Sequence, residues 1–403
     1  MSVRHAVAAG LIALAGLGVP GTLQAQATPD EITIRAAVLR IDTPAEVLPA
    51  SRLDLPPADL GLAGGRLATE DNATTGRFLG QRFETREVTA APEAAAQALA
   101  QLLDDGIRFV VTLADAEETG ALADQAAGRA LVFNARSGAE DLRNGGCRAN
   151  LLHTAPSDGM RADALAQFLV WKRWDRWLLV AGSHPEDRAL AEAYRHAATK
   201  FGAKIVSDLT FEDRGGARAT DSGHAQVQAQ MPVFLQKARD HDVVVTADRS
   251  GVFADWLIWN TWAPRPVAGS AGLMPVSWFP GHEGWGATQW QTRFEAEARR
   301  PAREEDYQVW LALRSLGEAA SRTRSGDFAA LSDYIRGPDF QLAGFKGQAL
   351  SFRDWDGQLR QPILLTSGRV LTSVSPQEGF LHPVSVMDTL GTDRPETGCN
   401  LGG

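Results

Sequence analysis

Cysteine and clustered positive charge are both scarce in this sequence. Only 2 of its 403 residues are cysteine, and 40 Lys and Arg face 49 Asp and Glu, for a formal net charge of -9. Proteins that bind nucleic acids normally present a basic surface, and no block of basic residues occurs here. We therefore expect no nucleic-acid partner. The two cysteines are also too far apart for a Cys-x-x-Cys redox pair.

Familiar catalytic signatures are absent as well. There is no Gly-x-x-x-x-Gly-Lys-Ser/Thr phosphate loop, no Gly-x-Gly-x-x-Gly after the first expected strand, no His-Glu-x-x-His and no Gly-x-Ser-x-Gly. The 8 histidines are scattered along the chain. These absences predict a protein that is not an enzyme, with no catalytic residues, no metal site and no required cofactor.

The one long apolar run lies at the start of the chain. A short positive stretch, MSVRH, precedes the run AVAAGLIALAGLGVPGTL, and a small-x-small cleavage pattern ends at Ala27. This order is typical of a secretory signal peptide. We expect residues 1–27 to be removed and the mature protein to be periplasmic. An uncleaved anchor is disfavoured because Pro20 and Gly21 interrupt the run.

The cysteine count fits an exported protein. Cys147 and Cys399 form an even and minimal set, which in an oxidising compartment suggests one disulfide. Such a bond ties the end of the chain back to a loop in its first half. Two free thiols are the alternative.

Strand and helix patterns alternate through the remaining chain. Continuous apolar strands such as IRFVVTL, RWLLVAG and VVVTA are typical of parallel sheets, and amphipathic helices separate them, VFADWLIWNTW being expected as one helix. This alternation and the length predict an α/β fold with two doubly wound parallel-sheet lobes. Asn72 matches a glycosylation acceptor pattern, but we interpret it as part of a helix stop.

A cluster of tryptophans in FLVWKRWDRWLLVAGS has two interpretations. It could be an aromatic platform for a planar ligand, or the junction between a helix and a buried strand. We favour the junction, in which Trp171 and Trp174 close the helix against the sheet and Trp177 begins the strand.

Polar residues follow the expected strands. In open α/β sheets, ligands bind beyond the carboxyl ends of the strands, and arginine there favours carboxylates. A second clue is the glycine-rich segment SWFPGHEGWGATQW, whose exposed tryptophans would suit a planar ring, although an aromatic-rich hinge is an equal alternative. The candidate ligand-binding residues are Asp115, Asn134, Arg136, Ser137, His184, Asp248, Arg249, Trp278 and Trp285.

The order of these elements resembles the leucine/isoleucine/valine-type (type I) periplasmic binding proteins of ABC transporters. The segments that carry this resemblance include ITIRAAVLR, PEAAAQALAQLLDDGIRFVVT, ALVFNARSG, RWLLVAGSHPED and EEDYQVWLALRSLGEA. The family implies two lobes joined by a three-strand hinge and closing over a ligand. The expected division is 28–155 plus about 279–335 for lobe 1, 156–278 plus about 336–375 for lobe 2, and a tail, 376–403, tied back to lobe 1.

Three further phrases, LDLPPADLGLAGG, EDNATTGRFLGQ and DTLGTDRPETGCN, resemble a subgroup associated with quinoprotein alcohol dehydrogenase systems. Some of its members bind pyrroloquinoline quinone (PQQ), a flat tricarboxylate. The resemblance implies a monomer that binds PQQ or a related aromatic carboxylate and serves an ABC permease or a periplasmic quinoprotein dehydrogenase. The alternatives are a binding protein for an amino acid, short-chain acid or alcohol and, less favoured, an accessory enzyme subunit.

Overall fold

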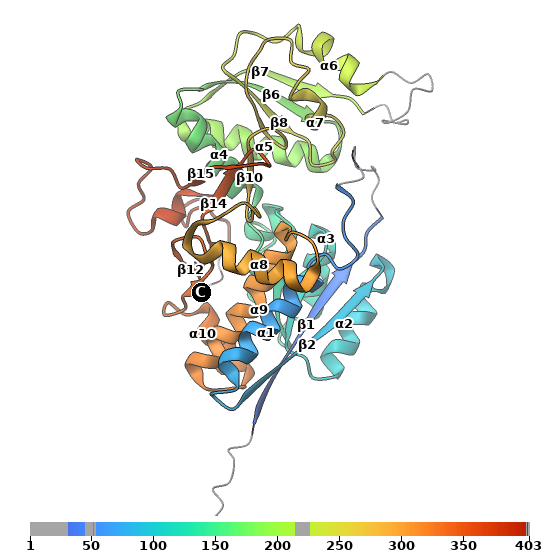
Figure 1. The fold of residues 1–403 in the computed structure, drawn as a ribbon, viewed down its shortest axis with the longest axis vertical. Helices are drawn as coiled ribbons and strands as arrows, with labels where there is room; N and C mark the ends of the chain where they lie inside the picture. The colour runs from blue at the N-terminus through green and yellow to red at the C-terminus, as the bar shows by residue number, and fades with distance from the viewer. Residues whose placement is uncertain (1–30, 45–50, 52–53, 214–225, 400, 402–403) are drawn as a thin grey trace, which may run out of the picture.

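The computed structural model describes residues 31–44, 51, 54–213, 226–399 and 401. The expected leader, residues 1–27, lies outside these residues. Figure 1 shows two lobes stacked along the long axis, each built around its own parallel sheet, as the α/β pattern predicts. No helix in the described ranges combines the length and apolar character needed to cross a membrane.

Lobe 1 is built on a five-stranded parallel sheet in the order β2-β1-β3-β4-β5. All five residues of β3 are buried, because helices cover both faces of the sheet. The strands are β1 (Ile32–Ile41), β2 (Gln81–Ala90), β3 (Phe109–Leu113), β4 (Leu131–Asn134) and β5 (Leu151–His153).

Two hydrophobic cores lie on the two faces of this sheet. The larger core packs against α1 (Leu62–Gly76), α8 (Ala287–Ala298), α9 (Glu304–Thr323) and α10 (Phe328–Arg336). The other face is covered by α2 (Ala95–Asp104) and α3 (Ala116–Gln125). Gly64 of α1 lies against the backbone of Asp306, so a side chain there would clash with α9.

Lobe 2 repeats this plan with a four-stranded parallel sheet in the order β7-β6-β8-β9. One face packs against α4 (Asp158–Trp171) and α5 (Pro185–Phe201), and the other against α6 (Val227–Leu235) and α7 (Ala254–Leu257). The strands are β6 (Arg176–Gly182), β7 (Lys204–Phe211), β8 (Val243–Ala247) and β9 (Val267–Gly269).

The chain passes between the two sets of cores three times. Leu152 belongs to a core of lobe 1 and Met160 to one of lobe 2; the chain returns before Trp278 and crosses again between Leu359 and Ile363. Two small antiparallel sheets border these crossings, in the orders β10-β14-β15 and β11-β12-β13. Their strands are β10 (Met274–Val276), β11 (Leu342–Ala343), β12 (Ala349–Phe352), β13 (Leu359–Arg360), β14 (Ile363–Thr366) and β15 (Leu371–Ser375).

The disulfide expected between Cys147 and Cys399 is confirmed, with 5.9 Å between the two Cα atoms. Before it, a 3-10 turn, η5 (Val386–Thr389), lies on lobe 2 near α4 and α5, where Gln167 bonds Thr389. In Figure 1 this red C-terminal part of the chain lies at the junction of the lobes, beside β14 and β15.

Several local expectations differ from the structure. Asn72 is not a helix stop: it is buried inside α1 and its amide donates to the Leu313 carbonyl at 2.8 Å. The helix expected over VFADWLIWNTW is only the four-residue α7, because Trp259 and Trp262 face solvent and give no apolar side to bury.

Two placements along the chain also differ from expectation. Trp171 is 56% exposed and so does not close its helix against the sheet, whereas Trp177 is fully buried in β6 as expected. The segment containing β11, β12 and β13, which the sequence pattern assigned to lobe 2, contributes Leu342, Leu350 and Phe352 to the core of lobe 1.

Candidate functional site

The loop after β4 presents one arginine at the carboxyl edge of the lobe 1 sheet. Asn134 is fully buried, and its side-chain oxygen accepts the backbone N–H groups of Arg136 at 3.1 Å and Ser137 at 2.8 Å. These bonds fix the turn, so Asn134 positions the loop rather than facing solvent. The Arg136 side chain is exposed, and its guanidinium bonds none of the residues that the structure describes.

Asp115 and Ser137 lie at the same edge of the sheet. Asp115 is the N-cap residue of α3 and is partly buried; its side chain makes no capping bond. The Ser137 hydroxyl accepts the N–H of Ala139 at 3.3 Å, and its carbonyl accepts from Arg143 at 3.0 Å. Both residues therefore border the Arg136 loop, as the strand-end rule predicts.

On lobe 2, the side chain of Asp248 holds the backbone of the turn that follows it. Its carboxylate is 5% exposed and accepts the backbone N–H groups of Val252, Phe253 and Ala254 at 2.6–2.8 Å. Burial raises the pKa of this carboxyl, and the backbone donors oppose that shift. Because its two oxygens are bonded to the turn that begins α7, Asp248 shapes the loop that carries Arg249.

His184 is engaged within lobe 2. It is the N-cap residue of α5, and its Nε2 lies 3.0 Å from the Asp213 carboxylate. This hydrogen bond raises the pKa of His184 above its usual value. The side chain can leave this pair for a ligand only by breaking the interaction with Asp213.

Asp158 joins the strand-end loops of the two lobes. It stands at the start of α4 with its side chain 8% exposed, and it forms an ion pair with Arg249. Its backbone N–H donates to the Gly138 carbonyl, in the loop after β4, at 2.8 Å. The Arg136 loop and Arg249 are therefore both linked to one residue, Asp158.

A second charged pair spans the lobes nearby. Arg161 of α4 and Glu304 of α9 lie 2.8 Å apart, and the Ser277 N–H donates to the same carboxylate. Burial disfavours the charge on Glu304, but the attraction of Arg161 outweighs it, and the pKa of Glu304 lies below its usual range.

Glu305, the next residue, carries a carboxylate that no described side chain neutralises by an ion pair. Burial raises its pKa, the neighbouring Glu304 adds to the shift, and the charge of Arg136 opposes it. The positive charge of Arg136 thus favours the ionised form of Glu305.

The two tryptophans expected to face a ring have different environments. Trp278 is 3% exposed, stacks on Tyr307 with ring centroids 4.5 Å apart, and donates its indole N–H to Gln291 at 2.9 Å. It belongs to the core, so we withdraw it from the candidate site. Trp285 is 59% exposed and lies against His282, with ring centroids 5.6 Å apart.

Sequence reasoning missed Asp158, Arg161, Glu304 and Glu305. Asp158, Glu304 and Glu305 lie in the first turns of α4 and α9, where acidic side chains are common for local reasons, and Arg161 lies one turn along α4. Nothing in the sequence marked these four residues as a group. Only the packing of the two helices brings them together. Among the described residues, no group of three or more His, Cys, Asp and Glu side chains could hold a metal ion.

Solved structures with the same arrangement are numerous. A periplasmic binding protein from Burkholderia mallei has a TM-score of 0.66 at 13% identity, and the match covers 92% of this chain and 100% of that one. The leucine-, isoleucine-, valine-, threonine- and alanine-binding protein from Brucella ovis, in a closed conformation, has a TM-score of 0.66 at 14% identity over 82% of this chain and 88% of that one.

A third neighbour is an ABC transporter solute-binding protein from R. palustris in complex with benzoate, with a TM-score of 0.63 at 14% identity. The match covers 91% of this chain and 99% of that one. No curated protein matches the sequence. At these identities the structural likeness establishes the fold. The family model described as periplasmic binding protein matches residues 58–369, and the chain therefore belongs to the periplasmic binding protein family.

Proposed function

We propose that this protein is the solute-binding component of an ABC transporter and holds a small carboxylate between its two lobes. The observation that carries the proposal is the exposed guanidinium of Arg136, held at the carboxyl edge of the lobe 1 sheet without an ion-pair partner among the described residues. Arginine binds carboxylates through two parallel hydrogen bonds, so such a group is suited to an anionic ligand. Arg249 lies on the facing loop of lobe 2, linked through Asp158.

The preferred ligand is an aromatic carboxylate, with PQQ as the specific candidate. The exposed ring of Trp285 offers an aromatic surface for a flat ligand. The R. palustris neighbour was solved with benzoate, an aromatic carboxylate. The phrases that resemble the quinoprotein-associated subgroup support PQQ itself.

An amino acid is the second candidate, and Glu305 is the observation that favours it. The charge of Arg136 acts on this carboxylate, so with Glu305 ionised the two side chains offer one charge of each sign, as a zwitterion requires. A structurally similar ABC transporter substrate-binding protein from Desulfitobacterium hafniense was solved in complex with leucine. An added carboxylate from PQQ would instead lie near like charge unless Glu305 is protonated.

We propose that the leader exports the protein, that it acts as a monomer, and that an ABC permease is its partner. A periplasmic quinoprotein dehydrogenase is the alternative partner. Ligand capture by lobe closure requires no cofactor and no chemical step, because a ligand shifts the balance between open and closed states through its differential contacts alone.

The test is a ligand panel applied to the purified mature protein. PQQ, benzoate and leucine are titrated while tryptophan fluorescence and the melting temperature are followed. A true ligand at one hundred times its Kd should stabilise the protein by about 2.7 kcal/mol. Saturable binding of PQQ or benzoate but not leucine supports the first candidate, and the reverse supports the second. A panel of carboxylates and amino acids that all fail to bind would refute the proposal, and so would recovery of an altered ligand.

A further inference from the structure

The C-terminal segment after β15, residues 376–399, is held on lobe 2 over part of its length; we name it the strap. The Gly391 N–H donates to the Asp163 carboxylate at 2.8 Å, and Lys200 donates to the Gly391 carbonyl at 2.8 Å. The Gln167 side chain donates to the Thr389 hydroxyl at 3.1 Å. Asp163 and Gln167 belong to α4 and Lys200 to α5, so the strap is bonded to both helices on one face of lobe 2.

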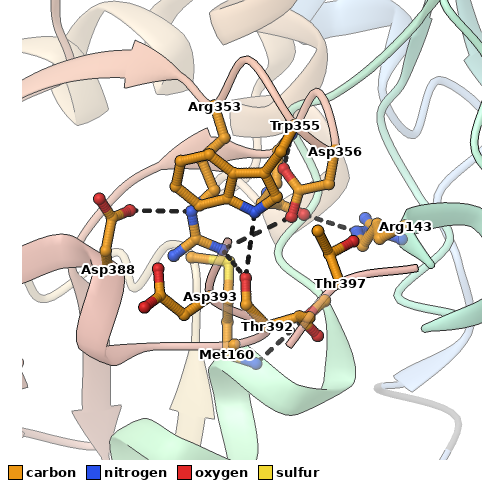
Figure 2. Close-up of polar contacts among 12 residues, drawn as sticks. Arg143, Met160, Arg353, Trp355, Asp356, Asp388, Thr392, Asp393 and Thr397 are labelled. Carbon is orange, nitrogen blue, oxygen red and sulfur yellow. Dashed lines mark hydrogen bonds and ion pairs between the residues drawn. The ribbon is translucent and has the colours of Figure 1, made fainter. Parts of the chain in front are cut away.

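Arg353 then links the strap to lobe 1. It follows β12, whose Phe352 lies in the core of lobe 1, and its guanidinium is almost fully buried. It donates to the Leu390 carbonyl at 2.6 Å and pairs with Asp388 at 2.9 Å (Figure 2). Leu390 itself lies in the α4–α5 core of lobe 2. One buried guanidinium therefore connects a lobe 1 hairpin to a segment seated on lobe 2.

Trp355 adds a second bond from the same hairpin. Its indole N–H donates to the Thr392 carbonyl at 3.3 Å, as Figure 2 shows. The indole also has three guanidinium groups around it, with Arg353, Arg360 and Arg394 at 5.0–5.2 Å from its ring. Arg353 and Arg360 belong to the hairpin itself, so the contact with Arg394 of the strap is the one that favours a fixed placement of the hairpin against the strap.

The far end of the strap is bonded to lobe 1. Cys399 forms the disulfide with Cys147, in the loop between β4 and β5, and the Gly398 N–H donates to the Asn144 side chain at 2.5 Å. The strap therefore leaves the small sheet beside lobe 2 as continuous chain and ends at lobe 1 through a covalent bond.

We propose that the strap is a fourth covalent connection between the lobes and limits how far they open. The three chain crossings can absorb a hinge rotation through a few backbone angles. The strap can follow that rotation only if Arg353 gives up its bonds to Asp388 and Leu390, which would deprive a buried guanidinium of its bonds to the strap. Opening the disulfide removes the covalent end and leaves the strap joined to lobe 1 by non-covalent contacts, which include the bonds of Arg353, the Trp355–Thr392 bond and the Gly398–Asn144 bond.

The test compares the ligand-free oxidised protein with the double variant C147S/C399S by small-angle X-ray scattering and hydrogen exchange. We expect a larger radius of gyration in the double variant. We also expect at least about tenfold faster exchange of the backbone amides of Leu390 and Gly391, which report local opening. The matched control is H382Q, because His382 pairs with Asp393 at 3.0 Å and its hydrogen bonds are all to residues of the strap; its scattering should equal that of the wild type.

A second arm guards against a folding defect in the double variant. The folded wild-type protein is treated with a dithiol, which transfers two electrons and two protons to the Cys147–Cys399 bond, yielding two thiols while the reagent becomes a cyclic disulfide. The reduced protein should scatter like the double variant. An unchanged radius of gyration and unchanged exchange in both arms would overturn the proposal. Because neither measurement uses a ligand, a failed strap leaves the solute-binding proposal intact, and a failed ligand panel leaves the strap intact.

Discussion

Arg161 of α4 and Glu304 of α9 form an ion pair of 2.8 Å between helices that belong to different lobes. The pair lies where the chain crosses after β10, since the same carboxylate accepts the Ser277 N–H. With side-chain exposures of 16% and 27%, the two charges are largely removed from water. Removing one partner would therefore leave the other charge poorly solvated.

The substitution E304Q should accordingly destabilise the protein by about 3–5 kcal/mol, the range for breaking a buried pair. The pKa of Glu304 is lowered in the folded state, so its stabilising effect exists above the ordinary carboxyl range and disappears as the pH falls through the folded value. Urea unfolding at several pH values measures this. The control is E318Q in the more exposed pair with Arg322, which should cost less than about 1 kcal/mol. Equal effects of the two variants would contradict the prediction.

Asp356 should make stability fall as the pH rises. Burial raises its pKa to about 6, whereas the unfolded chain has a carboxyl pKa of about 3.9. The folded state thus binds the proton more tightly, and stability is lost between about pH 4 and pH 6. D356N should remove this slope and raise the free energy of unfolding at pH 7 by up to about 3 kcal/mol.

The matched control is D388N, because Asp388 and Asp356 both lie against the guanidinium of Arg353, at 2.9 and 3.7 Å. Asp388 pairs with both Arg353 and Arg360, so its loss should destabilise the protein. In denaturant unfolding at pH 7, we expect the free energy of unfolding to rise in D356N and to fall in D388N. A pH profile of D356N with the wild-type slope would show that Asp356 is not the titrating group.

R136Q should weaken the binding of a carboxylate ligand without affecting the fold. Hydrogen bonds to charged groups contribute about 1.5–3 kcal/mol, which corresponds to roughly 10- to 150-fold in Kd. R136K should lie between, because lysine keeps the charge but not the two-pronged geometry. Calorimetric titration checks this, with R82Q as the control, since Arg82 lies on β2 and pairs with Glu84. Unchanged affinity in R136Q would remove Arg136 from the site.

D158N should strengthen the binding of an anion. Asp158 forms an ion pair with Arg249, and a ligand carboxylate that reaches this guanidinium must replace Asp158. Removing a like charge about 4 Å away is worth at least about 1 kcal/mol, the value in bulk water, or about fivefold in Kd. The control is D104N, which removes a similarly paired carboxylate on the surface of lobe 1. Weaker binding in D158N would mean that Asp158 itself contacts the ligand.

Substituting Trp278 should affect mainly stability, whereas substituting Trp285 should affect mainly ligand binding. W278A removes a buried ring and should lower the free energy of unfolding by about 3–5 kcal/mol. W285A should change it by less than about 1 kcal/mol, because the ring is mostly exposed. If the ligand stacks on Trp285, W285A alone loses the ligand-dependent change in fluorescence. Full retention of that change would exclude Trp285.

Local patterns predicted the framework of this protein correctly. The continuous apolar stretches FVVTL and VVVTA are buried strands, because such runs satisfy a sheet covered on both faces. The Cys147–Cys399 disulfide was expected because the chain has two cysteines and an export signal that leads to an oxidising compartment. The strands depend on interactions among neighbouring residues, and the disulfide had only one possible pairing of two cysteines.

The two ion pairs Arg161–Glu304 and Arg249–Asp158 could not be inferred from local patterns. Arg161 and Glu304 are separated by 143 residues, and Arg249 and Asp158 by 91. Trp278 shows the same limit, because a glycine-rich context suggested exposure while its packing against Tyr307 buried it. Periodicity reports which face of a segment prefers water, since that preference is local. The partner of a charged or aromatic side chain is set by how distant helices and lobes are placed, and that placement arises from the packing of the whole chain.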